Sequence, residues 1–361
     1  ARWTDFPIPE PGAAEIPADG DVRGVVVAGD GDYDRGALLD AAEALGFPVL
    51  ATALSGLRGL GVISGYHHLL SQGVPEALRP ELVIGVGSLG PSRRLDALVS
   101  AADTRIRIDH WGRSIDPDRD ATHRLHADPV ATLQALVGRL RAEPGWGAAW
   151  REAEDFLEMA VVELLADSTA PTGALVARAL NEVPWEALVV ASSLPVREVD
   201  AHLRRTGPVL ANRGASGIDG FVSTALGVAS LGRPTVALAG DLSLFHDCNG
   251  FLAEGDDDLV VVVVDNGGGG LFDDLPQAEH APWYERLFVT PHGRDLSQLA
   301  RLHALGYDEV AVAGETAGVV TAALAEGGRS VVRVPIDRET DRQARRALDE
   351  VGARVASSVQ A

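Results

Sequence analysis

Short apolar runs rich in β-branched residues alternate along this chain with segments whose apolar residues recur at helical spacing. Residues 23–28 read RGVVVA, end in the turn Gly29-Asp30-Gly31 and are followed by a helical pattern that stops at Gly46. Neighbouring parallel strands need a crossover connection, usually a helix. The alternation therefore predicts an α/β fold with mainly parallel sheets flanked by helices.

The same patterns place the other expected elements and two domains. We expect strands at 48–52, 82–86, 105–108, 187–191, 235–239, 259–264 and 330–335, and helices at 128–141, 147–165, 173–181, 195–203, 217–231, 245–252 and 296–305. A length of 361 residues favours two domains, and the break at 168–173 places their boundary near residue 165. We therefore expect an extended, proline-rich lead-in at 1–20 and α/β domains at 21–165 and 166–361.

The charge of the chain restricts its ligands. The formal net charge is −21, so no basic surface is expected for nucleic acid or an anionic membrane. The sequence has no lysine, which excludes a lysine Schiff base and the lysine of a P-loop. Anionic ligands must therefore be held by arginine or by backbone amides.

The cysteine content and the apolar runs bear on location. Cys248 is the only cysteine, so no internal disulfide can form, and it is expected to be a small buried residue rather than a nucleophile. The longest apolar runs are far shorter than the roughly 20 residues of a membrane-spanning helix. We expect a cytoplasmic protein.

Two glycine-containing segments follow predicted strands and carry the strongest functional pattern. Gly240-Asp241-Leu242-Ser243 follows the strand at 235–239, and Asp265-Asn266 with four glycines, Leu271 and Phe272 follows the strand at 259–264. Crevices at the carboxyl ends of parallel strands are where open α/β sheets bind ligands. Carboxylate, amide and carbonyl oxygens suit Mg²⁺, and glycines let backbone approach a phosphate. Either segment alone could be an ordinary turn, but together they favour a metal and diphosphate site.

This pair of segments resembles the fingerprint of thiamine diphosphate enzymes, in which Gly-Asp is followed by Asn-Asn. Leu242 stands where many members have glycine, Asp265 replaces the first asparagine, and the spacing is short, whereas the metal-binding Asn266 is retained. Residues 212–220, NRGASGIDG, look like the signature of 2-succinyl-5-enolpyruvyl-6-hydroxy-3-cyclohexene-1-carboxylate synthase (SEPHCHC synthase) of menaquinone biosynthesis. Residues 192–197, 223–227, 268–272 and 288–293 agree with that family in the same order.

The resemblance implies a role for each matching position. It implies that Asp241, Asn266 and the Gly268 carbonyl hold Mg²⁺, and that the cofactor lies against Gly240, Leu242, Ser243 and Gly269, with Ile218 as the wedge that bends it. It implies that Ser193, Arg197 and Arg213 bind substrate carboxylates, and that Leu271 and Phe272 line the pocket near the thiazolium. The alternatives without a functional role are that Ile218 belongs to the hydrophobic core and that Arg197 is a surface residue. His292 is assigned no chemistry and is expected to stabilise its Pro-His-Gly turn.

The resemblance also implies an activity and partners. The family uses thiamine diphosphate and Mg²⁺ to decarboxylate 2-oxoglutarate and adds the succinyl-semialdehyde unit to isochorismate. Its members have three αβ domains, and 21–165 and 166–361 correspond to the central and diphosphate-binding ones. The chain begins at Ala1 and has Met159 as its only methionine, so we expect a fragment without the amino-terminal pyrimidine-binding domain and its activating glutamate, and weak activity by itself.

A homo-oligomer is expected, with the site completed by the pyrimidine-binding domain of a partner subunit. Two alternatives stay open: a non-catalytic module that binds a diphosphate or nucleotide, and another thiamine diphosphate-dependent 2-oxoacid decarboxylase.

Overall fold

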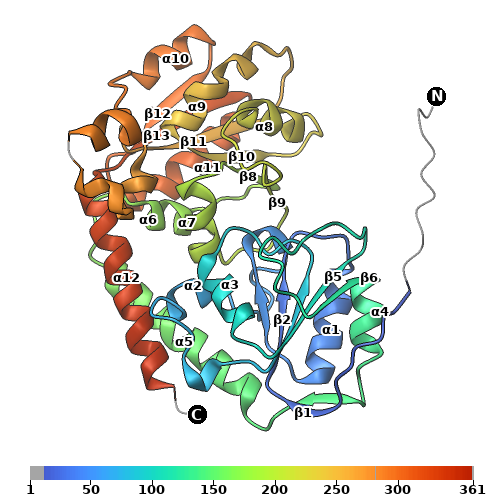
Figure 1. The fold of residues 1–361 in the computed structure, drawn as a ribbon. Helices are drawn as coiled ribbons and strands as arrows, with labels where there is room; N and C mark the ends of the chain where they lie inside the picture. Colours follow the sequence, from blue (N-terminus) through green and yellow to red (C-terminus); the bar gives the residue numbers. More distant parts are fainter. Residues whose placement is uncertain (1–11, 281, 360–361) are drawn as a thin grey trace, which may run out of the picture.

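Two parallel β-sheets organise the chain, one on each side of residue 165 (Figure 1). The computed structural model describes residues 12–280 and 282–359. The first sheet has the order β3-β2-β4-β5-β6, and the second has the order β12-β13-β11-β10-β8-β9. Every pairing within these sheets is parallel, which confirms the predicted fold class.

The strands and helices have the following bounds. The strands are β1 (Gly20–Val22), β2 (Gly24–Ala28), β3 (Val49–Ala51), β4 (Leu82–Val86), β5 (Thr104–Asp109), β6 (His123–His126), β7 (Leu140–Ala142), β8 (Ala187–Val190), β9 (Val209–Ala211), β10 (Thr235–Gly240), β11 (Leu259–Asp265), β12 (Gly306–Glu309) and β13 (Arg329–Pro335). The α-helices are α1 (Arg35–Leu45), α2 (Tyr66–Leu69), α3 (Arg93–Ser100), α4 (Pro129–Gln134), α5 (Trp146–Leu165), α6 (Gly173–Ala179), α7 (Leu194–His202), α8 (Phe221–Ala229), α9 (Asp241–Asp247), α10 (Leu296–Leu302), α11 (Thr316–Glu326) and α12 (Arg338–Ser358).

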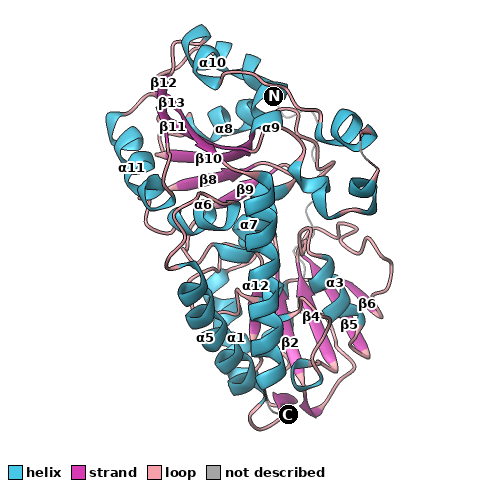
Figure 2. Cartoon of the chain, turned by 90° about the vertical axis from the view of Figure 1, so that its left-hand side faces the viewer, coloured by secondary structure: helices cyan, strands magenta, loops and turns pink. Residues whose placement is uncertain are grey.

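The central strands are buried on both faces, as their continuous apolar sequences predict. All seven residues of β11, LVVVVVD, are buried, and so are all five of β2. Figure 2 shows helices on either side of each sheet. Burying a valine side chain fully is worth roughly 1.5–3 kcal/mol, so these strands anchor both sheets and fix where their carboxyl ends lie.

Polar and glycine residues set where the helices start and stop. Asp34 accepts a hydrogen bond from the Ala37 amide at the start of α1, and Gly46 ends that helix with φ of 71°. The predicted helix at 128–141 is wrong beyond Gln134. Asp128 caps its start, but Gly138 has φ of 86°, and the chain then forms β7, which pairs with β1.

The predicted helix at 245–252 is also only partly correct. The α-helical part starts earlier, as α9, and ends at Asp247, after which residues Cys248–Leu252 form a 3₁₀ helix. The segment at 12–19 has no regular secondary structure, as expected for the lead-in, but Ile16 is fully buried in the core of the first sheet. Residues 1–11 of the lead-in lie outside the described residues.

The last helix, α12, returns from the second sheet to the helices of the first (Figure 1). It packs on α2 and α5, and its residues Leu348 and Val351 share a core with Leu157 of α5. A Cβ on Gly352 would lie 2.2 Å from the His68 carbonyl oxygen, so only glycine permits this approach. The carboxyl-terminal helix therefore completes the hydrophobic core on one side of the first sheet.

Candidate functional site

A cavity of about 330 Å³ opens at the carboxyl ends of β8, β10 and β11. Every site residue predicted from the sequence lines it: Ser193, Arg197, Arg213, Ile218, Gly240, Asp241, Leu242, Ser243, Asn266, Gly268, Gly269, Leu271 and Phe272. They come from four separate segments of the second half of the chain, 193–197, 213–218, 240–243 and 266–272. The strand order explains the gathering, because β8, β10 and β11 are neighbours and end at the same edge of the sheet.

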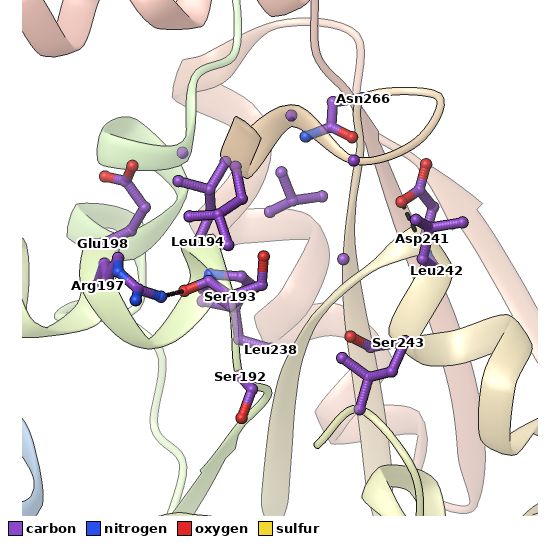
Figure 3. Close-up of a pocket in the computed structure, with 18 of the residues that line it drawn as sticks. Ser192, Ser193, Leu194, Arg197, Glu198, Leu238, Asp241, Leu242, Ser243 and Asn266 are labelled. Carbon is purple, nitrogen blue, oxygen red and sulfur yellow. Dashed lines mark hydrogen bonds between the residues drawn. The ribbon is translucent and has the colours of Figure 1, made fainter. Parts of the chain in front are cut away.

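The polar end of the cavity is built from the first residues after β10 and β11 (Figure 3). Asp241 is 1% exposed, and its Oδ1 accepts a hydrogen bond of 2.7 Å from the Leu242 amide. Burial raises the pKa of the Asp241 carboxyl, and the hydrogen bonds from His292 and Leu242 oppose that rise. Asn266 also lines the cavity, and its Oδ1 accepts a bond of 3.3 Å from the Gly268 amide.

The glycine run is a fixed loop. Gly267 and Gly268 have φ of 74° and 148°, values that other residues rarely adopt. A Cβ on Gly268 would lie 2.3 Å from the Val289 carbonyl oxygen, and the Gly269 amide donates a 2.7 Å hydrogen bond to that oxygen. At Gly240, in contrast, a Cβ would meet nothing within 4 Å. The backbone of Gly268 and Gly269 is thus packed against Val289, whereas the space beside Gly240 is open.

The opposite end of the cavity carries two arginines from α7 and from the loop after β9. Arg197 donates a 2.6 Å hydrogen bond to the Ser193 carbonyl, and Arg213 donates one of 3.3 Å to the Ser192 hydroxyl. Burial lowers the pKa of both guanidinium groups, and the positive charges of Arg213 and Arg93 lower that of Arg197 further. Within residues 12–280 and 282–359, no carboxylate forms an ion pair with Arg197 or Arg213. This end is therefore suited to an anionic ligand.

Ser193 is held in a conformation that is uncommon for a residue with a side chain. Its φ is 78° at the start of α7, directly beside the arginine end. Such strained backbone costs of order 1–3 kcal/mol and is concentrated at ligand sites. The geometry supports a functional position for Ser193 over an ordinary turn.

Sequence reasoning missed three groups at or beside this cavity. Glu198 and Asp341 line it, and His292 contacts Asp241 from a loop 51 positions further along. Glu198 carries no motif, and Asp341 lies in the strongly charged start of α12, so neither offered a signal. The expected role of His292 in its turn is confirmed, because its Nδ1 accepts a 2.9 Å hydrogen bond from the Arg294 amide.

The residues at the polar end fit a hard divalent cation bound to a diphosphate. They supply a buried carboxylate, an amide oxygen and carbonyls of a glycine loop, which are oxygen ligands of the kind that Mg²⁺ binds. The open space at Gly240 leaves room for a ligand to approach the backbone.

Fold and site together define the diphosphate-binding domain of a thiamine diphosphate enzyme. The family model described as "Thiamine pyrophosphate enzyme, C-terminal TPP binding domain" matches residues 199–334. That range includes Arg213, Ile218 and all of the cavity segments after β10 and β11.

Relatives along nearly the whole chain identify the family. The chain is 40% identical to a protein of Rubrobacter xylanophilus, with 90% of this chain and 60% of the relative covered, and 39% identical to one of Thermobifida fusca, with 92% and 60% covered. It is 36% identical to one of Halobacterium salinarum, with 90% and 58% covered. All three are named 2-succinyl-5-enolpyruvyl-6-hydroxy-3-cyclohexene-1-carboxylate synthase. The chain belongs to this family, and it spans about three fifths of the length of these relatives.

Among the helices of the described residues, none combines the length and the apolar composition needed to cross a membrane.

Proposed function

We propose that this chain carries the diphosphate- and substrate-binding part of a SEPHCHC synthase. The proposed reaction is the thiamine diphosphate-dependent decarboxylation of 2-oxoglutarate and addition of the remaining succinyl-semialdehyde unit to isochorismate, in menaquinone biosynthesis. The observation that carries the proposal is that one cavity joins a hard-oxygen ligand set to Arg197 and Arg213, which have no carboxylate partner among the described residues. One end suits a cation and a diphosphate, and the other suits dicarboxylate substrates.

At the polar end, we assign the metal to Asp241, Asn266 and the Gly268 carbonyl. Leu242, Ser243 and Gly269 line the same cavity, and we assign them to the contact with the diphosphate. Asp241 is buried, and a buried carboxylate needs a charged or hydrogen-bonding partner, which Mg²⁺ would supply. In this proposal, the polar end of the cavity binds and orients the metal and the diphosphate.

At the middle and the arginine end, the assigned residues shape the cavity and hold charge. We assign Ile218, a rigid β-branched side chain that lines the cavity, to the support of a bent cofactor. Leu271 and Phe272 add apolar lining. Arg197 and Arg213 neutralise substrate carboxylates, while Ser193 positions Arg197 through its carbonyl. The bound cofactor supplies the nucleophilic carbon and the electron sink for loss of CO₂, and this chain supplies orientation and charge.

The proposal includes partners and a location. The remaining two fifths of the relatives' length leaves room for a pyrimidine-binding domain, and we propose that such a domain, from the same or a partner subunit, completes the site in a homo-oligomer. A single cysteine and substrates of this class support a cytoplasmic location.

Calorimetric titration tests the binding part of the proposal. We expect the chain to bind thiamine diphosphate in the presence of Mg²⁺, and Asp241→Ala to abolish that binding. Asp256→Ala, which changes an exposed acidic residue of the loop before β11, serves as the matched control and is expected to bind normally. Tighter binding of ADP than of thiamine diphosphate, or normal binding by Asp241→Ala, would favour the nucleotide-binding alternative.

An activity assay tests the reaction. The chain is mixed with 2-oxoglutarate, isochorismate, thiamine diphosphate and Mg²⁺, alone and together with the part of a curated relative that this chain does not match. Product formation in either mixture supports the assignment. Decarboxylation of another 2-oxoacid in preference to 2-oxoglutarate would instead favour a different decarboxylase of the same class.

A further inference from the structure

His292 is fixed beside the buried Asp241 by contacts on both ring nitrogens. Nδ1 accepts a hydrogen bond of 2.9 Å from the Arg294 amide, so this nitrogen carries no proton. The proton of the neutral ring must then lie on Nε2, which is 2.9 Å from Asp241 Oδ2. Nε2–H therefore donates to the carboxylate. The ring also packs edge-on against Phe245, with centroids 4.8 Å apart, and its side chain is only 13% exposed.

The second carboxylate near His292 has other partners. Asp265 Oδ1 lies 3.9 Å from His292 Nε2, which is too long for a hydrogen bond. Asp265 instead accepts bonds of 2.6 Å from Arg333 Nε and 3.2 Å from the Gly267 amide. The imidazole proton is thus directed to Asp241 and is not shared with Asp265.

The loop that carries His292 also holds the glycine run. The Val289 carbonyl accepts the hydrogen bond from the Gly269 amide, and Gly268 packs directly against the same residue. Residues 288–293 therefore contact both halves of the site, Asp241 after β10 and the glycines after β11. A single loop therefore contacts both the Asp241 carboxylate and the backbone of the glycine run.

We propose that His292 is a positioning residue of the metal and diphosphate centre, which fixes the Asp241 carboxylate by donating its Nε2 proton to Oδ2. The inference rests on the proposed function, since Asp241 is a metal ligand only there. A carboxylate offers about four lone-pair sites, and the bonds from His292 and Leu242 occupy two, so both oxygens keep capacity for a cation. Outer partners of this kind orient metal ligands, and their loss typically weakens metal binding by about 10–100-fold.

The test uses Mn²⁺ as the metal probe, with the free ion followed by electron paramagnetic resonance in the presence of saturating thiamine diphosphate. We expect His292→Leu to weaken Mn²⁺ binding by about 10–100-fold. His292→Gln keeps an N–H donor near the position of Nε2 and is expected to recover much of the affinity. His246→Leu removes an exposed histidine from α9, the helix that begins with Asp241, and is expected to bind as the wild type does.

Each outcome has a separate meaning. Wild-type affinity in His292→Leu overturns this inference and leaves the proposed function intact. Absence of Mn²⁺ binding in the wild type with thiamine diphosphate overturns the proposed function itself. Should His292→Leu lower the melting temperature, His292→Gln decides: recovered affinity supports positioning through the hydrogen bond, and an equal loss in a folded His292→Gln overturns it.

Discussion

The buried Glu198 of α7 makes the stability of this protein depend on pH in a way that one substitution can reveal. Glu198 is 6% exposed, and burial raises its pKa from 4.5 to about 8, with the negative charge of Asp341 as the next cause. Arg345 opposes the rise and Asp349 adds to it. His202 lies 3.7 Å away but is fully buried, and burial lowers its pKa well below the usual value, so it brings no positive charge.

The sign and size of the effect follow from the difference between the folded and unfolded states. Between pH 4.5 and 8 the folded chain keeps a proton on Glu198 that the unfolded chain releases, so this residue's contribution to stability falls as the pH rises. A pH of 7 lies 2.5 units above 4.5, the pKa of this carboxyl in the unfolded chain, which corresponds to roughly 3–4 kcal/mol at about 1.4 kcal/mol per unit. Glu198→Gln keeps the shape of the neutral glutamic acid side chain but cannot ionise, so this loss of stability with rising pH disappears. We expect it to stabilise the chain by up to about 3 kcal/mol more at pH 7 than at pH 4.5.

Urea unfolding followed by circular dichroism at a series of pH values between 4.5 and 8.5 measures this effect. The advantage of Glu198→Gln over the wild type is expected to grow up to about pH 8 and then level off. Glu186→Gln changes an exposed glutamate just before β8 and is the control, for which no such growth is expected. A stability difference between Glu198→Gln and the wild type that stays constant across this range would refute the reasoning.

Three further changes have defined outcomes. Gly268→Ala places a Cβ 2.3 Å from the Val289 carbonyl oxygen at a positive φ, so we expect a loss of about 1–3 kcal/mol in thermal melts and weaker diphosphate binding in calorimetry. Asp349→Asn weakens a bidentate pair with Arg94 and is expected to cost about 1.5–3 kcal/mol at pH 7. Since the pKa of Asp349 is lowered below its usual 3.8, that cost is expected to shrink as the pH falls below about 4 in the same unfolding assay. Arg213→Gln is expected to lower the affinity for 2-oxoglutarate at least about tenfold, with thiamine diphosphate binding unchanged in calorimetry.

The parallel sheets could be predicted because their central strands are unusually uniform. A strand such as β11, with five consecutive valines, is buried on both faces and shows its state in its composition alone. The edge strand β6, HRLH, is half exposed and polar, so it gave no signal. The helix α12 was missed for a related reason: its first ten residues are strongly charged, and most of its buried apolar residues lie in its second half.

The gathering of the predicted site residues followed from the fold and the motifs. Asp241 and Asn266 each come directly after a strand, and neighbouring parallel strands bring their ends together. The contact between His292 and Asp241 could not be predicted, because it depends on the path of a long loop whose course is set by packing against the glycine run. Pairings between distant loops have no sequence period to reveal them.

The course of α12 determines how this protein can be divided. Near its start, Asp341 accepts a hydrogen bond from the Gly173 amide at the wall of the cavity, and further along Leu348 and Val351 lie in a core with Leu157. A gene cut at residue 165 would therefore separate side chains that fill the same interior. Neither half would then fold stably by itself. We expect residues 21–165 and 166–361 to unfold in one cooperative transition, so that local unfolding in the first half would also disturb the wall of the binding cavity.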